Sequence, residues 1–152
     1  MSRISLLSIE EITEKLNYLN KNSKPNWGKM SSSQMLKHCS KFIDLYLGKI
    51  SVPFWYKYFG ITIGKLFLRY ISKKSPLETP RNIKTDKSLK ITDEYLDFDY
   101  EKKVLINKLI KLHEINGQIN HPIYGIMKSE KIIFLIKHHT IHHLNQFNLI
   151  VN

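Results

Sequence analysis

Cysteine is nearly absent from this chain of 152 residues, in which Cys39 is the only one. One thiol excludes an intramolecular disulfide framework and predicts a reducing, cytoplasmic location. Six glycines and five prolines are too few for a collagen-like or linker-dominated chain. Hydrophobic residues nevertheless make up 42% of the sequence, which is enough for a buried core. We therefore expect a single domain over residues 1–152.

Long uncharged hydrophobic runs are also lacking. The most apolar stretch, residues 52–71, contains Lys57, Lys65 and Arg69, and three cations would be costly inside a bilayer. The first 20 residues contain three glutamates and no long apolar run, unlike a secretory signal. We expect no membrane span, although an interfacial helix within residues 52–71 stays open.

Arginine is scarce, with three residues against 21 lysines. The net charge of +11 comes from residues 21–90, where 15 basic side chains face three acidic ones. Such a surface could attract nucleic acid, lipid head groups or a small anion. Base recognition and bidentate phosphate binding favour arginine. A nucleic-acid partner is therefore not expected, and a solvated lysine-rich surface is the simpler interpretation.

Four segments have the apolar spacing of amphipathic helices. They cover residues 8–20, 31–48, 99–114 and 129–149. In the first two, a serine is followed three residues later by Glu or Gln, which predicts a capping box. Ser129 is expected to cap the last helix.

The remaining sequence predicts connections. Residues 49–75 favour one or two short helices broken around Pro53 and Gly60, and residues 76–98 favour an irregular crossing with weak strand character at 89–96. A turn is expected at His121-Pro122-Ile123-Tyr124-Gly125. Because no strand pair has a hairpin signal, we expect an all-α four-helix bundle whose longer crossing joins the second and third long helices.

Four of the seven histidines lie in the last helical segment. On a helical wheel, His139, His143 and Gln146 occupy the middle of the apolar face, and His138 and His142 lie on its flank. Buried polar groups need partners, and two histidines one turn apart fit a metal-binding pair. Hydrogen-bonded core histidines stay open as the alternative.

His38 lies on the apolar face of the second segment. Inward residues of facing bundle helices converge on one core, so His38 could join His139 and His143 around a metal ion. Three imidazoles leave coordination positions open for water or substrate, as in catalytic sites, and suit zinc, nickel, iron or copper. A lone core histidine is the alternative. Cys39 is a poor fourth ligand because it points about 100° away from His38.

Three motifs together resemble a DinB-like family of unknown function. They are Trp27-Gly28-Lys29-Met30-Ser31 leading into Gln34-Met35-Leu36-Lys37-His38, His121-Pro122-x-Tyr124-Gly125, and His139-Thr140-Ile141-His142-His143-Leu144-Asn145-Gln146-Phe147. The wider DinB/YfiT-like superfamily carries H-x3-H-x2-Q in the last helix, which His139, His143 and Gln146 match. Residues 49–98 carry no recognisable motif and are expected to shape the pocket.

The resemblance implies a DinB-like four-helix bundle that holds a divalent metal, here zinc, nickel or iron, through His38, His139 and His143. It also implies a homodimer. The aromatic-rich residues 54–59 independently favour a partner surface. Some superfamily members are metal-dependent transferases that act with a low-molecular-weight thiol. The resemblance therefore implies that a thiol of this kind could serve as a cofactor.

The sequence assigns no catalytic residue. His142, Gln146 and His121 are candidates for a base or for a group that orients a ligand. Surface or interface positions for His138 and His142, and a turn position for His121, are the alternatives. The leading hypothesis is a metal-dependent enzyme, a transferase or hydrolase. The alternative is a non-catalytic helical binding module whose basic surface docks an anionic partner.

Overall fold

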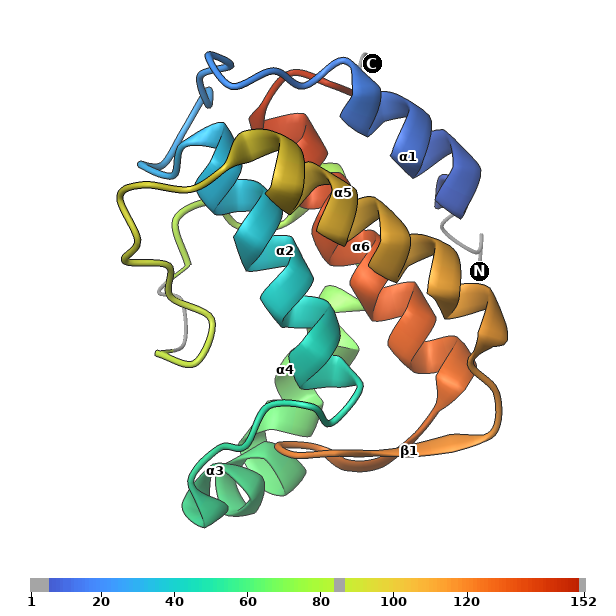
Figure 1. Ribbon diagram of the computed structural model, residues 1–152. Helices are drawn as coiled ribbons and strands as arrows, with labels where there is room; N and C mark the ends of the chain where they lie inside the picture. Colours follow the sequence, from blue (N-terminus) through green and yellow to red (C-terminus); the bar gives the residue numbers. More distant parts are fainter. Residues whose placement is uncertain (1–5, 84–86, 151–152) are drawn as a thin grey trace.

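The computed structural model describes residues 6–83 and 87–150, which are mostly helical with a small antiparallel sheet (Figure 1). The helices are α1 (Ile9–Asn17), α2 (Ser32–Tyr46), α3 (Phe54–Phe59), α4 (Lys65–Ile71), α5 (Phe98–Ile110) and α6 (Ser129–Gln146). Shorter helical turns are η1 (Gly60–Gly64), which is π-helical, and the 3-10 turns η2 (Pro76–Glu78) and η3 (Lys111–Glu114). The strands are β1 (Gln118–His121) and β2 (Gly125–Lys128). Within the described ranges, every helix is too short or too polar to cross a membrane.

Both predicted capping boxes are confirmed. The Glu11 backbone N–H donates to Ser8 Oγ at 3.1 Å, and the Ser8 N–H donates to the Glu11 carboxylate at 2.6 Å. Ser31 and Gln34 make the same exchange at 3.2 and 2.9 Å. Each box satisfies two backbone donors that a helix start leaves open, which stabilises the helix by about 1 kcal/mol.

The predicted cap of α6 is wrong. The N-cap residue is Lys128, and Ser129 is already the first helical residue. Strand β2 continues directly into α6, and the Ser129 N–H donates to the Gly117 carbonyl at 2.9 Å. The Gly117 carbonyl, just before β1, therefore satisfies one backbone N–H group at the start of α6. The sequence analysis expected a serine side chain to do this.

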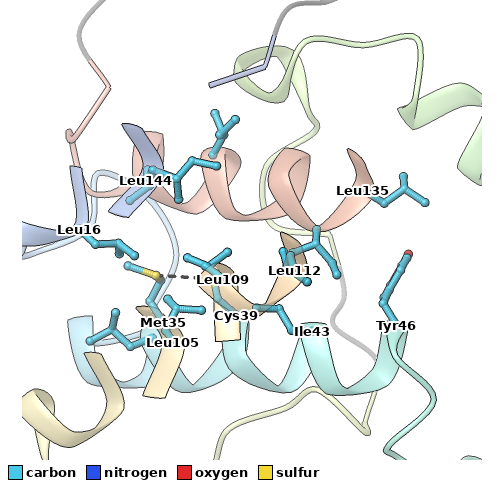
Figure 2. Packing of buried hydrophobic residues seen from close by; sticks show 14 of the residues in the cluster. Leu16, Met35, Cys39, Ile43, Tyr46, Leu105, Leu109, Leu112, Leu135 and Leu144 are labelled. Atoms are coloured by element: carbon cyan, nitrogen blue, oxygen red, sulfur yellow. Dashed lines mark hydrogen bonds between the residues drawn. The ribbon is translucent and has the colours of Figure 1, made fainter. Parts of the chain in front are cut away.

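Apolar side chains from the four long helices form one core, in which α1 and α2 each pack against α5 and α6. Figure 2 shows these side chains meeting in the space between the helices. The fully buried members include Leu16, Met35, Ile43, Leu105, Leu109 and Leu144. Burial of one such side chain contributes about 1.5–3 kcal/mol. This core holds α2 against α6 and so brings His38 to the histidines of α6.

The expectation of an all-α chain without a hairpin is wrong at residues 118–128. Here β1 and β2 pair in antiparallel register, with Gln118 opposite Lys128 and His121 opposite Gly125. Four residues per strand are too few for a clear alternating pattern. The predicted turn at residues 121–125 lies at the tip of this hairpin, where Gly125 adopts a positive φ of 75°.

Two parts of the connection between α2 and α5 reach the site. One is the described part of residues 72–97, which follow α4 and which we call the crossing segment, and the other is residues 54–71. The described part of residues 76–98 is irregular apart from η2 and the start of α5, as predicted, and the weak strand signal at 89–96 forms no strand. Residues 54–71 form what we call the aromatic arm, made of α3, η1 and α4. It extends beyond the C-terminal end of α2 (Figure 1).

The aromatic arm packs on the hairpin tip through two glycines. A Cβ at Gly60 would lie 2.3 Å from the Ile123 carbonyl oxygen, and a Cβ at Gly64 would lie 2.7 Å from the Tyr124 ring. Only glycine allows this close approach of backbone to neighbour. Much of the arm's outer surface is apolar and exposed, at Phe54, Trp55, Tyr58, Phe59, Ile63, Leu66 and Tyr70.

Candidate metal centre

Three histidines from two helices converge at one point. His38 lies on α2, and His139 and His143 lie one turn apart on α6. One ring nitrogen from each lies within 4.8 Å of the other two, and His38 Nε2 is 3.0 Å from His139 Nε2. Three nitrogen donors this close together could hold a metal ion. The structure thus brings together the three residues that the sequence selected.

The crossing segment orients the His38 ring. His38 Nδ1 lies 3.1 Å from the Leu89 carbonyl oxygen, to which it must donate because a carbonyl only accepts. The proton is therefore on Nδ1, and the Nε2 lone pair faces His139. Lys37 Nζ holds the crossing segment in place through the Asp93 carboxylate at 2.8 Å. A hydrogen bond from one ring nitrogen to a carbonyl is a common way to orient a histidine whose other nitrogen binds a metal.

A relay through Gln146 orients the His143 ring. Gln146 Nε2 donates to the Trp27 carbonyl at 2.6 Å, which fixes the direction of the side-chain amide. The amide oxygen Oε1 then faces His143 Nδ1 at 2.8 Å and accepts its proton. His143 Nε2 is left with a free lone pair. The loop that carries Trp27 is itself attached to α6, since the Asn26 N–H donates to the Gln146 carbonyl at 2.8 Å.

Aromatic stacking positions the third ring. His139 lies nearly parallel to Phe42, with 3.7 Å between ring centroids and 4° between ring planes. Phe42 stacks in turn on Tyr46 at 4.2 Å. Two of the three stacked rings come from α2 and the third, His139, comes from α6. They restrict His139 to the orientation in which its Nε2 faces His38.

Burial keeps all three imidazoles neutral. It lowers the pKa of His143 to about 3 and the pKa of His38 below its usual value, although the Leu89 carbonyl opposes the shift in His38. Burial, together with His143 and His38 nearby, lowers the pKa of His139 well below its usual value. Neutral imidazole is the form that ligates metals. The donor set, the tautomers of His38 and His143, and the neutral charge of the imidazoles fit a divalent ion.

One comparison places the chain among known sequences. The family model described as a protein of unknown function (DUF1569) matches residues 2–149. The chain belongs to the DUF1569 family. No curated protein and no solved structure matches it. The family description names no activity, so the function of this DUF1569 protein must be argued from its site.

The two other histidines of α6 bind the crossing segment. His138 Nε2 lies 3.0 Å from the Lys74 carbonyl oxygen, and His142 Nδ1 lies 3.3 Å from the Pro76 carbonyl oxygen. The expected surface or interface position is wrong for His138, whose residue is only 2% exposed. A helical wheel gives the direction of a side chain but not the segment that covers it.

The candidates His121 and Cys39 lie in structural positions. His121 is buried in the hairpin turn, where its Nδ1 accepts the N–H groups of Ile123 at 3.0 Å and Tyr124 at 3.2 Å. Burial lowers its pKa to about 4. Cys39 lies in the core with its Sγ 3.8 Å from Met35 Sδ, away from the three histidines.

A cavity of about 660 Å³ opens beside the three histidines. Its walls come from α2, α4, α6, the hairpin tip, the Trp27 loop and the crossing segment. Residues that sequence motifs did not select include Phe67, Leu68, Ile71, Thr79, Asn82 and Ile83. They lie within residues 49–98, which the sequence analysis expected to shape the pocket.

Proposed function

We propose that this DUF1569 chain is a DinB-like four-helix-bundle protein and a metal-dependent enzyme. The packing of α1 and α2 against α5 and α6 supports the bundle. The observation that carries the function is the convergence of three neutral imidazoles beside a cavity large enough for a small molecule. His38, His139 and His143 are the proposed ligands of one zinc, nickel or iron ion. The buried Cys39 thiol agrees with the proposed cytoplasmic location.

A divalent ion with three protein ligands supplies a Lewis acid that lowers the pKa of a bound water or thiol. That chemistry fits a hydrolase or a transferase that uses a low-molecular-weight thiol. The chain itself contributes orientation and exclusion of water. Leu89, Gln146 and Phe42 hold the three imidazoles in place, and the apolar cavity walls limit solvent around the reacting groups.

Metal content of the purified full chain tests this proposal. We expect one divalent ion per chain, and its loss in His38→Ala and His139→Ala, because two imidazoles make a poor site. His113→Ala is the matched control: this histidine is exposed and pairs with Glu10 at 3.0 Å on the surface. Circular dichroism must show that each variant is still helical. Retention of the ion by folded His139→Ala would overturn the proposed site.

We also propose that the protein is a homodimer that pairs through the aromatic arm. Exposed apolar patches commonly mark protein partner sites. The arm exposes aromatic and aliphatic side chains along α3, η1 and α4, and Phe54 is 88% exposed. Burial of this surface against a second copy would remove it from water.

A second candidate function is docking of an anionic partner without catalysis. The observation in its favour is charge: residues 49–75, which include the aromatic arm, contain six basic and no acidic side chains. Binding of anionic vesicles or nucleic acid that weakens steeply with salt, and that does not require metal, would support this candidate.

A further inference from the structure

The shape and charge of the cavity indicate what it binds. Resting on the metal site proposed above, we infer that the cavity takes an amphiphilic carboxylate, with its carboxylate beside the three histidines and its apolar body along the walls. Three features of the cavity favour such a ligand: the chemistry of its walls, the balance of charge around it, and the residues at its mouth.

The walls of the cavity are mainly apolar. The buried part is formed by Leu68 and Ile71 of α4, Leu89 of the crossing segment and Leu135 of α6. Phe42, which stacks on His139, continues this surface up to the metal ligands. A ligand body that fills this space would gain from burial of apolar surface, and a polar body would lose its hydration and find few partners along these apolar walls.

The balance of charge favours an anion. Neutral imidazoles do not compensate the charge of a divalent ion. Among residues 6–83 and 87–150, no Asp or Glu lines the cavity, whereas Lys29 does. Arg81 adds a second cation nearby, with its guanidinium 4.2 Å from the centre of the Trp27 ring. A negative charge on the ligand would offset part of this excess in a site of low dielectric constant.

The mouth of the cavity carries both apolar and polar residues. Phe67 is 44% exposed, and Ile83 is also exposed, so apolar surface continues from the cavity to solvent. Lys29 is exposed as well and supplies a donor to an oxygen of the ligand. Asn82 supplies a second polar group in the lining. A carboxylate has two oxygens, so one can meet the ion while the other accepts from such donors.

Calorimetric titration of the zinc-loaded full chain separates the contributions of head group and body. The probes are decanoate, hexanoate, acetate, decanol and decylamine. We expect decanoate to bind at least about tenfold more tightly than decanol, and decylamine to bind more weakly still. Affinity should rise by twofold to fourfold per methylene from hexanoate to decanoate, where about fourfold corresponds to complete burial. Removal of the metal should abolish the preference for decanoate over decanol.

Two matched pairs of exposed residues place the ligand in the cavity. Phe67→Asp should weaken decanoate binding about tenfold, whereas Phe54→Asp, in the same arm but outside the cavity, should leave it unchanged. Any effect on association through the arm is shared by this pair. Lys29→Met should weaken decanoate binding two- to threefold without affecting decanol, and Lys24→Met in the same loop should affect neither.

The outcomes separate this inference from the function on which it rests. A zinc-loaded protein that binds decanol as tightly as decanoate, or acetate as tightly as decanoate, would overturn the inference while the metal site stands. Equal loss of binding in Phe67→Asp and Phe54→Asp would also overturn it, because the loss would then come from the arm as a whole and not from the cavity wall that Phe67 forms. Metal analysis of the same sample detects the other failure: a chain that holds no divalent ion overturns the proposed function and this inference with it.

Discussion

Gln146 Oε1 lies 2.8 Å from His143 Nδ1, and this contact sets the tautomer of the histidine. The Trp27 carbonyl holds the other end of the Gln146 amide at 2.6 Å and prevents it from turning over. The loop before α2 and the end of α6 therefore jointly determine which nitrogen of His143 is free. Partners of this kind typically contribute 10–100-fold to metal affinity.

The first prediction concerns this relay. Gln146→Leu should weaken metal binding by about 10–100-fold, because His143 loses the acceptor that holds its proton on Nδ1. Gln146→Glu restores an acceptor for His143 but places a carboxylate against the Trp27 carbonyl, so it should recover only part of the affinity. Asn145→Leu, on the same helix, is the control. Competition with a metal chelator measures all three, and unchanged affinity in folded Gln146→Leu would contradict the role of the relay.

The second prediction concerns Gly28, which lies in the same loop with a positive φ of 81°. A Cβ at this position would lie 2.7 Å from Gln146 Nε2. Gly28→Ala should therefore displace the Gln146 side chain and weaken metal binding, in addition to the ~1–2 kcal/mol that a left-handed backbone costs a non-glycine residue.

Gly117→Ala separates these two effects. Gly117 has a similar φ of 75°, but a Cβ there would meet nothing within 4 Å. It should lose stability through the backbone alone and keep its full affinity for the ion. Chemical denaturation and metal titration of both variants make the comparison. Equal metal affinities would show that Gly28 is required by the turn and not by the site.

The inward direction of each of the three histidines could be predicted from sequence because it depends on local periodicity. A spacing of four residues places His139 and His143 on one helix face, and the apolar neighbours of His38 turn it inward. The capping box of Ser31 follows from the same kind of local rule. Each of these features depends on residues within one or two turns of a helix.

The partners of the triad could not be predicted because they come from far along the chain. The carbonyls of Leu89 and Lys74 contact His38 and His138 only after the crossing segment has folded over α2 and α6. Every residue has a backbone carbonyl, so the sequence does not indicate which carbonyl will accept a hydrogen bond from a histidine. The hairpin at residues 118–128 was missed for a related reason, since its short strands pair through backbone groups.

The third prediction concerns acid. Burial lowers the pKa of His143 to about 3, against an ordinary value of 6.5. Between these values the unfolded chain binds more protons than the folded chain, so the free energy of unfolding must decrease as the pH falls. The metal-free protein should therefore lose stability steadily as the pH falls below about 6.5.

Urea denaturation at several pH values between neutral and acidic tests this prediction on the metal-free chain. His143→Gln should reduce the dependence of stability on pH, because one buried titrating group is removed. His113→Gln, in which the substituted histidine is exposed, is the matched control and should change the profile less than His143→Gln does. A His143→Gln profile as steep as that of the unchanged chain would show that His143 does not carry the effect.

The fourth prediction concerns the aromatic arm. Light scattering at micromolar concentration should give the mass of a dimer. The double variant Tyr58→Asp/Leu66→Asp should give a monomer, because both side chains are exposed on the arm and two carboxylates in each copy would resist burial.

Tyr95→Asp is the control, since Tyr95 is the most exposed aromatic residue outside the arm. Both variants should remain helical and bind the metal ion, because neither the arm surface nor Tyr95 touches the three histidines. A dimer that persists in the double variant would place the interface elsewhere, and a monomer in the unchanged protein would exclude pairing through the arm.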